Sequence, residues 1–190
     1  MQKNIKNKSN KVMIAAAVIL AVIVVVLVIL LILEASGVLY RADDDTVTIT
    51  PPKRADLERH TDGDYQYALL KDGTVIILGY TGTAGETLEI SSSLGGKTVT
   101  AIEESAFALS LLNTKAVIVP EGVTYIGKMA FFGAENATLY LPSTIEQIAN
   151  QATYGFDDPV AIYFAGTKKQ WEKVKIGSGN KELVIVTCQK

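Results

Sequence analysis

The sequence predicts a short solenoid of stacked β-strands behind one N-terminal transmembrane helix. Three observations lead to this prediction. Residues 12–33 form a 22-residue apolar run without a charged residue. Two β-rich segments near residue 70 are joined by Asp72-Gly73, which is a strong hairpin signal. Further along, one pattern recurs at offsets of 22–24 residues, and a fixed period of that length is typical of solenoids.

The apolar run has the length of a membrane span. As a helix, 22 residues would extend over about 33 Å, close to the roughly 30 Å of a bilayer core. A cleaved signal peptide has a shorter apolar region of about 7–15 residues, so an uncleaved signal anchor is favoured. Four lysines precede the run. The positive-inside rule therefore predicts a cytoplasmic basic tail at 1–11 and an extracellular C-terminal part, in a single-pass protein of the cell membrane.

A stalk is predicted for residues 34–64. They mix charged residues, prolines and turn formers, and they show no long apolar period. Residues 46–50 alternate Thr with Val and Ile, a weak strand signal that Pro51-Pro52 ends. We interpret this segment as an extracytoplasmic tether, and His60 as an exposed histidine within it.

The repeat domain is predicted from residue 65 onward, and it begins with a hairpin. Segments 65–70 and 74–80 are β-rich, and they lie on either side of the Asp72-Gly73 turn. A solenoid needs a cap at each end. We expect this hairpin to be the N-terminal one.

The repeats are clearest when residues 117–131 are aligned with residues 139–153 at an offset of 22. Both copies have apolar-x-apolar-Pro, then apolar-x-x-Ile, then Ala four residues later. An earlier copy is offset by 24 residues from Val99 onward, and a partial copy begins at Ile162. An L-x-L strand at this period is typical of leucine-rich repeats, here three to four of them. The predicted apolar columns are Leu88/Val117/Leu139/Ile162, Ile90/Val119/Leu141/Phe164, Val99/Val123/Ile145, Ile102/Ile126/Ile148 and Ala106/Ala130/Ala152.

A helix and a strand are predicted as the C-terminal cap. Thr167 and Gln170 have the spacing of a capping box, so a short helix should begin there. Trp171 would then lie over the last repeat. Residues 177–180 should turn the chain into a closing strand at 183–187.

Several of these segments together resemble the BspA-like leucine-rich-repeat family. They are DGTVIILGYTGTAGETLEI, TVTAIEESAF, VPEGVTYIGKMAF, LPSTIEQIA and YFAGTKKQWEKVKIGSGN, and they cover about residues 65–190. The resemblance implies a bacterial surface protein with a short β-rich solenoid. It also implies adhesion or the binding of proteins or host matrix, and it brings no enzymatic activity.

A candidate binding stripe follows from the strand pattern. The middle residue of each L-x-L strand should point away from the core. These middle residues are Glu89, Ile118, Tyr140 and Tyr163. We predict a partner-binding stripe of Ile118, Tyr140 and Tyr163, with Thr138 and Tyr125 nearby, because aromatic residues are favoured in interfaces. The alternative is plain β-propensity on a half-exposed sheet, or cover by the stalk.

Composition excludes several other functions. One Cys and one His leave no disulfide framework, no Cys-based zinc site and no two-His metal motif. Beyond residue 33 the chain has 20 acidic and 14 basic residues, a net charge of −6 that argues against a nucleic-acid partner. Nucleophile and phosphate-loop motifs are absent, so no catalytic residue, metal or cofactor is predicted.

The predicted function is therefore non-catalytic binding by a membrane-anchored, outward-facing module. Its partner would be an extracellular protein or a cell-surface polymer. The alternative is a structural or accessory subunit of a cell-envelope complex.

Overall fold

The computed structural model describes residues 39–41, 47–56, 58–156, 160–180 and 183–189. The basic tail at 1–11 and the predicted anchor at 12–33 lie outside the described residues. Among the residues that are described, no helix is both long enough and apolar enough to cross a membrane. The anchor therefore stays a prediction.

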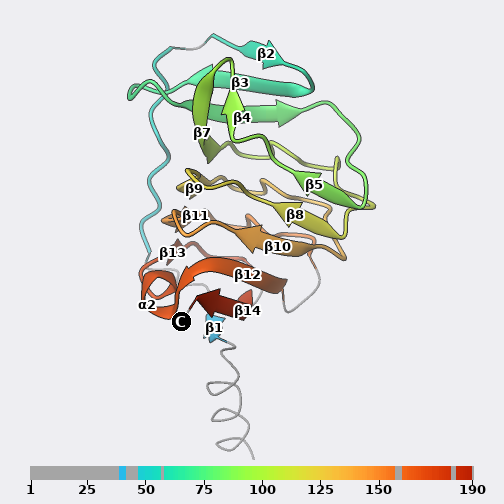
Figure 1. Cartoon of the computed structure of the whole chain (residues 1–190), viewed down its shortest axis with the longest axis vertical. Helices are drawn as coiled ribbons and strands as arrows, with labels where there is room; N and C mark the ends of the chain where they lie inside the picture. Colours follow the sequence, from blue (N-terminus) through green and yellow to red (C-terminus); the bar gives the residue numbers. More distant parts are fainter. Residues whose placement is uncertain (1–38, 42–46, 57, 157–159, 181–182, 190) are drawn as a thin grey trace, which may run out of the picture. The chain divides into compact units, whose positions relative to one another are not determined.

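The repeats wind into a solenoid of about four turns, in which successive turns add one strand to each of two sheets (Figure 1). The first is a six-stranded sheet in the order β1-β14-β12-β10-β8-β5, and the second is an eight-stranded sheet that includes β13-β11-β9-β7-β4-β3-β2. The six-stranded sheet comprises β1 (Leu39–Arg41), β5 (Thr87–Glu89), β8 (Ala116–Ile118), β10 (Thr138–Leu141), β12 (Val160–Thr167) and β14 (Leu183–Gln189). The eight-stranded sheet comprises β2 (His60–Asp62), β3 (Tyr65–Leu69), β4 (Val75–Tyr80), β7 (Lys97–Ile102), β9 (Tyr125–Ile126), β11 (Gln147–Ile148) and β13 (Lys175–Ile176), with β6 (Ser93–Leu94) paired to β7.

The strand register confirms the predicted repeat alignment. In the six-stranded sheet the Cα partners run Leu88, Val117, Leu139 and Ile162 across four parallel strands. In the other sheet Ile102, Ile126, Ile148 and Ile176 are partners in the same way. Each turn thus places the same position of the repeat directly above the previous one, which is what the 22–24-residue period requires.

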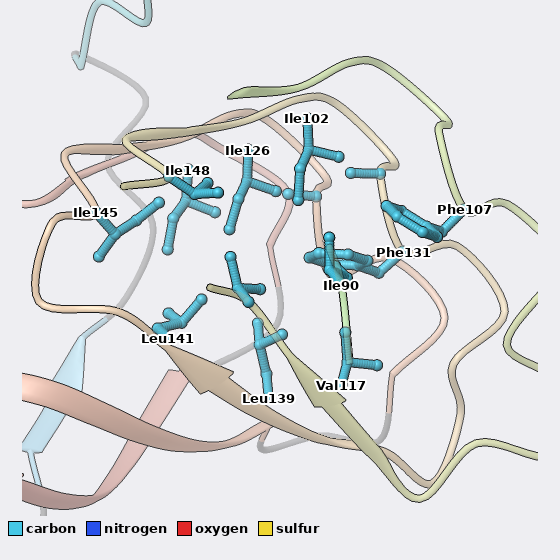
Figure 2. Close-up of a cluster of buried hydrophobic side chains, with 14 of the residues drawn as sticks. Ile90, Ile102, Phe107, Val117, Ile126, Phe131, Leu139, Leu141, Ile145 and Ile148 are labelled. Atoms are coloured by element: carbon cyan, nitrogen blue, oxygen red, sulfur yellow. The ribbon is translucent and has the colours of Figure 1, made fainter. Parts of the chain in front are cut away.

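These columns form the core between the two sheets (Figure 2). The stacked isoleucines and leucines are almost completely buried, and Phe107 and Phe131 pack with ring centroids 5.8 Å apart. Fully burying one such side chain contributes about 1.5–3 kcal/mol. Truncating one of them, for example Ile126→Ala, should cost about 2–5 kcal/mol because a cavity is left behind.

The two predicted caps are present. At the N-terminal end, β3 and β4 pair as an antiparallel hairpin, and the Asp72 carboxylate accepts hydrogen bonds from the Thr74 N–H and hydroxyl at 3.0 and 2.6 Å. At the other end, helix α2 (Lys168–Trp171) begins with the Thr167/Gln170 capping box. Trp171 is buried, and its ring centroid lies 5.3 Å from that of Phe164.

Asn180 ties the last turns of the solenoid together. Its amide Nδ2 donates to the carbonyl oxygens of Ala149 and Gly177, at 2.9 and 2.7 Å. Its Oδ1 accepts from the Thr153 N–H and hydroxyl, at 3.1 and 3.2 Å. The side chain is buried, so these bonds satisfy polar groups that water does not reach.

The described part of the predicted stalk lies against the repeats, which the sequence did not indicate. β1 pairs antiparallel with β14 at one end of the six-stranded sheet, and β2 pairs with β3 at the other end of the molecule. Residues 47–56, here called the N-terminal strap, run along the outside of the eight-stranded sheet between these ends (Figure 1). The stalk boundaries at 34–64 stay a prediction, while contacts with the repeats already occur within this segment.

His60 is also placed differently from its prediction. It belongs to β2, its ring centroid lies 5.2 Å from that of Tyr67, and its Nε2 is buried without a hydrogen-bond partner. The interpretation as an exposed linker histidine was wrong, because the partners of this segment are distant in sequence and leave no local periodicity.

Candidate binding surface

The predicted stripe exists as a row of Cα partners on the outward face of the six-stranded sheet. Glu89, Ile118, Tyr140 and Tyr163 lie side by side on β5, β8, β10 and β12. Their strand neighbours point inward and are buried, whereas these four side chains are exposed or half-buried. We call Ile118, Tyr140 and Tyr163 the sheet row. Its alignment is confirmed, while binding by the row stays a prediction.

Tyr140 and Tyr163 stack within the sheet row. Their ring centroids are 4.8 Å apart and their planes differ by 10°. This separation matches the roughly 4.7–4.9 Å between neighbouring strands, so the register of β10 and β12 sets the stack. Each ring covers one face of the other. The outer edges, which carry the phenol hydroxyls, are therefore what a partner would meet.

The surface beside the sheet row is uncharged on its central strands. Thr87, Ala116 and Thr138 are Cα partners in the next outward row. Among the described strands, the charged side chain nearest to the sheet row is Glu89, which lies next to Ile118 on the edge strand β5. A partner would therefore desolvate few charged groups at the centre of the face, which keeps the cost of contact low.

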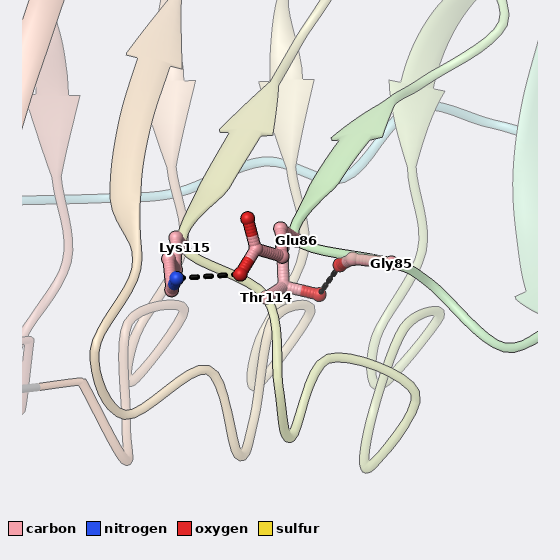
Figure 3. A network of polar contacts seen from close by, with 4 residues as sticks. All are labelled: Gly85, Glu86, Thr114 and Lys115. Carbon is pink, nitrogen blue, oxygen red and sulfur yellow. Dashed lines mark hydrogen bonds and ion pairs between the residues drawn. The ribbon is translucent and has the colours of Figure 1, made fainter.

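A polar cluster fixes the turns that lead into β5 and β8 (Figure 3). The Lys115 ammonium donates to the Glu86 carboxylate at 2.5 Å, and both side chains are largely exposed. The hydrogen bond from Lys115, and then its positive charge, lower the pKa of Glu86. The Thr114 hydroxyl donates to the Gly85 carbonyl at 3.0 Å. These contacts align the starts of the two strands and so support the register of the sheet row.

Tyr125 is not part of this surface. It lies in β9 of the eight-stranded sheet and is 7% exposed. Burial raises the pKa of its phenol, and the negative charges of Glu103 and Glu104 raise it further. The prediction that Tyr125 lies near the stripe was wrong, because the chain crosses from one sheet to the other between residues 118 and 125.

A cavity of about 480 Å³ lies between the N-terminal strap and the repeats. Ile49 and Pro51 of the strap line one side, and the repeats contribute Glu103, Glu104, Tyr125 and Lys128 among other residues. We call it the strap groove. Sequence reasoning missed it because it treated residues 34–64 as a tether and considered cover by this segment only for the sheet row.

A second apolar patch lies on the connecting segments that follow the eight-stranded sheet. Leu109, Leu112 and Tyr154 are 60%, 62% and 46% exposed, against 36% for Tyr140. Phe132 and Tyr154 stack with centroids 5.7 Å apart. The repeat alignment contained this signal, since positions 132 and 154 are one period of 22 apart, but the prediction considered only the strands.

Among the described residues, no group of three or more His, Cys, Asp or Glu side chains gathers as a metal site would require. In the strap groove, the Glu103 carboxylate is a type of group that can bind a metal, but it is paired with the Arg54 guanidinium.

Comparison with known proteins finds resemblance at the level of structure. No family model matches the sequence, and no curated protein does. A leucine-rich-repeat protein from T. pallidum, TpLRR, shares 24% identity and a TM-score of 0.46 over 57% of this chain. A leucine-rich-repeat protein from Bacteroides capillosus shares 22% identity, with a TM-score of 0.39, and a leucine-rich cell surface protein from Faecalibacterium prausnitzii shares 18%, with a TM-score of 0.36.

The structural neighbours are thus bacterial leucine-rich-repeat proteins, the class that the sequence motifs indicated. Each match covers 57% of this chain. The matched part spans 54% of the T. pallidum protein, 99% of the B. capillosus protein and 45% of the F. prausnitzii protein.

Proposed function

We propose that this chain is a non-catalytic interaction module that binds another protein through the outward face of the six-stranded sheet. The observation that carries the proposal is the sheet row itself. Ile118, Tyr140 and Tyr163 are in register on adjacent strands, and the two tyrosine rings are already stacked. The six-stranded sheet is a rigid support for such a row, since its inner face is packed into the core.

The side chains of the sheet row are already ordered in the free protein, which favours binding. Tyrosine is enriched among the residues that contribute most to protein interfaces. Immobilising a free side chain on association costs about 0.5–1.5 kcal/mol. The Tyr140 and Tyr163 rings restrict one another before any partner binds. Folding has therefore already removed part of their side-chain freedom, and less of it is lost on binding.

The ring orientation supports a protein partner over a polysaccharide. A sugar packs the C–H groups of one side against the electron-rich face of an aromatic ring. In the stack, the inner faces of Tyr140 and Tyr163 are turned to one another. The exposed edges instead offer hydroxyls that donate to and accept from backbone amides, which a protein surface provides.

The size of the face predicts a transient complex. Its six strands are three to eight residues long and lie about 4.8 Å apart, which gives a face of roughly 450 Å². A standard stable interface buries about 800 Å² on each partner. Binding through this face alone should therefore be weak, and several modules side by side on one membrane would be needed for firm attachment.

The proposal places the module outside the cytoplasm, carried by a single anchor at residues 12–33. This placement rests on the four lysines before the run, against Arg41 as the first basic residue after it. To test it, a Lys169→Cys substitution is made in a Cys188→Ser background, and intact cells are treated with a membrane-impermeant maleimide. Labelling of intact cells supports the placement. Labelling only after permeabilisation contradicts it.

Photocrosslinking tests the binding face. A benzoylphenylalanine at position 140 is compared with one at position 154, because both replace a partly exposed tyrosine on different sides of the solenoid. The proposal expects a defined protein adduct from position 140 alone. Ile118→Asp should abolish it, and Leu112→Asp should leave it intact. The same adduct from both positions would favour an accessory subunit packed into a larger complex, and an adduct that survives Ile118→Asp would reject the sheet row.

A further inference from the structure

We propose that the outer face of the eight-stranded sheet is a second, peptide-binding site, which the chain's own strap occupies in this structure. Its ligand class is an extended peptide in which an apolar residue is followed five positions later by an arginine, as Ile49 is followed by Arg54. This site lies on a different sheet from the sheet row and does not depend on it.

The face beneath the strap is apolar. Ala101, Tyr125 and Ala149 belong to a hydrophobic cluster that is separate from the main core, together with side chains of the N-terminal hairpin. In β4, Val75 and Ile77 point into the core, while Ile76 points to this outer cluster. Ile49 of the strap packs against it. A strand face that is apolar on both sides requires a cover, and the strap provides one.

The strap groove is also acidic at one end. Glu103 and Glu104 follow β7 directly, and the Arg54 guanidinium of the strap pairs with the Glu103 carboxylate. The two side chains of this pair are 27% and 32% exposed. The same two glutamates raise the pKa of Tyr125 beyond the effect of its burial. Lys128 lines the groove further along, so the acidic end is the place where a basic residue is favoured.

The spacing of the two contacts fits an extended segment that crosses the strands. The Thr50 N–H donates to the Gln147 side chain of β11 at 2.9 Å, and Arg54 reaches Glu103 two strands away. Two strand spacings amount to about 10 Å, while four extended residues span about 13 Å. A peptide in this path is recognised by side chains on successive turns, and at its arginine end it also pairs with the hairpin backbone, as Arg54 pairs with Leu70 in an antiparallel bridge.

Few backbone hydrogen bonds hold the strap on the sheet, so another peptide could replace it. Pro51 and Pro52 have no N–H to donate to the sheet. Thr48, Thr50 and Lys53 have exposed side chains. The backbone bonds to the hairpin lie at the end of the strap, where the Ala55 N–H donates to the Leu69 carbonyl at 2.8 Å and the Lys53 carbonyl accepts from the Lys71 N–H at 3.2 Å. The strap also leaves about 480 Å³ of the groove unfilled beneath Ile49 and Pro51. A peptide with a larger apolar residue would fill this space and displace the strap, whose local opening requires little free energy.

The test uses the full-length chain in detergent and a fluorescein-labelled peptide of residues 47–56. Ile49→Asp in the chain removes the apolar contact of its own strap. Because the strap no longer competes, the peptide should bind this variant about tenfold more tightly than it binds the unsubstituted chain. Arg54→Glu in the chain provides a second route to the same opening if Ile49→Asp impairs folding, which far-UV circular dichroism detects.

A charge exchange tests the acidic end. Adding Glu103→Arg to the opened chain should weaken peptide binding about tenfold or more, and a peptide carrying Arg54→Glu should restore it. Glu135→Arg, at an exposed acidic residue of a connecting segment, is the matched control and should change nothing. Absence of binding to both opened variants, or binding that is unaffected by the charge exchange, would overturn the proposal.

A second copy of the chain is the competing occupant. Thr50→Cys and Gln147→Cys are placed on separate chains in a Cys188→Ser background, and the two chains are mixed under oxidising conditions. Disulfide-linked dimers at micromolar concentration would show that straps exchange between copies, which would overturn the assignment to a foreign peptide. Absence of dimers, together with peptide binding to the opened chain, supports it.

Discussion

Tyr140 and Tyr163 are Cα partners on neighbouring parallel strands, and their rings stack at 4.8 Å because the strands themselves lie that far apart. The repeat period sets this relationship. Residues 139 and 162 are equivalent inward-facing positions 23 residues apart, so the residue after each one points outward at the same height. Any slip of β12 by one residue would turn one ring into the core.

The stack should be measurable without a partner. In a double-mutant cycle on Tyr140→Ala and Tyr163→Ala, we expect a coupling of about 0.5 kcal/mol in the free energy of unfolding, at the lower end for aromatic pairs because both rings are partly exposed. Urea denaturation provides the values. The same cycle on Tyr140 and Tyr154, which lie on different sides of the solenoid, should give no coupling.

Leu109 has a strained backbone that glycine would relieve. Its φ is 63°, and Gly133 and Gly155 stand at the equivalent positions of the next two turns with φ near 90°. The left-handed conformation costs an ordinary residue about 1–2 kcal/mol, more than the roughly 0.5–1 kcal/mol that glycine loses in the unfolded chain.

Leu109→Gly should therefore raise the free energy of unfolding by about 0.5–1 kcal/mol. Leu112→Gly is the control, because Leu112 is equally exposed but has an ordinary φ. It should lower stability. If both glycine variants are destabilised in urea, the strain at Leu109 is not relieved and the prediction is wrong.

Gly127 is required by a close approach between turns. A Cβ there would lie 2.5 Å from the carbonyl carbon of Glu103 and 2.6 Å from the backbone nitrogen of Glu104. Backbone atoms of a packed turn cannot move aside cheaply, so Gly127→Ala should cost about 2–3 kcal/mol. Gly85→Ala, where a Cβ meets no atom within 4 Å, should change stability by less than about 0.5 kcal/mol. Thermal unfolding of the pair checks this contrast.

Asn180 should be the most sensitive polar residue of the C-terminal turns. Asn180→Ala removes the hydrogen bonds to Ala149, Gly177 and Thr153 in a place where water does not replace them. We expect a loss of about 3 kcal/mol. Asn150→Ala, an exposed residue that donates to the Ser178 hydroxyl at 3.2 Å, should lose less than about 1 kcal/mol. Equal losses would show that the network around Asn180 is not formed.

Alkaline pH should destabilise the fold through Tyr125. Burial, and then Glu103 and Glu104, raise the pKa of its phenol above 10.0. The folded state keeps the proton that the unfolded state loses, so stability is fully present below pH 10 and falls as the pH rises through the folded pKa. Tyr125→Phe cannot titrate. Its free energy of unfolding should decline less steeply above pH 10 than that of the unsubstituted chain, and identical slopes in urea titrations would contradict the prediction.

The repeats were predictable because each apolar column depends on a local period. Val117, Leu139 and Ile162 occupy the same position of a 22–24-residue pattern, and solenoid contacts join only neighbouring copies. The capping box at Thr167 and the turn at Asp72-Gly73 are likewise signals within a few residues. The outward alignment of Ile118, Tyr140 and Tyr163 followed from the same period.

Residues 47–62 could not be placed in this way. Ile49 packs on a cluster that includes Tyr125, and Arg54 meets Glu103, which is 49 residues away. Contacts of this length leave no period in the sequence, so a segment with charges and prolines was interpreted as a tether. The same limitation misplaced Tyr125, whose side chain belongs to the opposite sheet.

The sequence by itself determined the solenoid, its register, its caps and the row on the six-stranded sheet, because all of these repeat or arise from neighbouring residues. Only the tertiary structure decided that residues before the first repeat cover the eight-stranded sheet and leave an acidic groove beneath them. The physical reason is that this cover depends on an apolar face and a charge, Glu103, that become a single surface only after the turns have stacked.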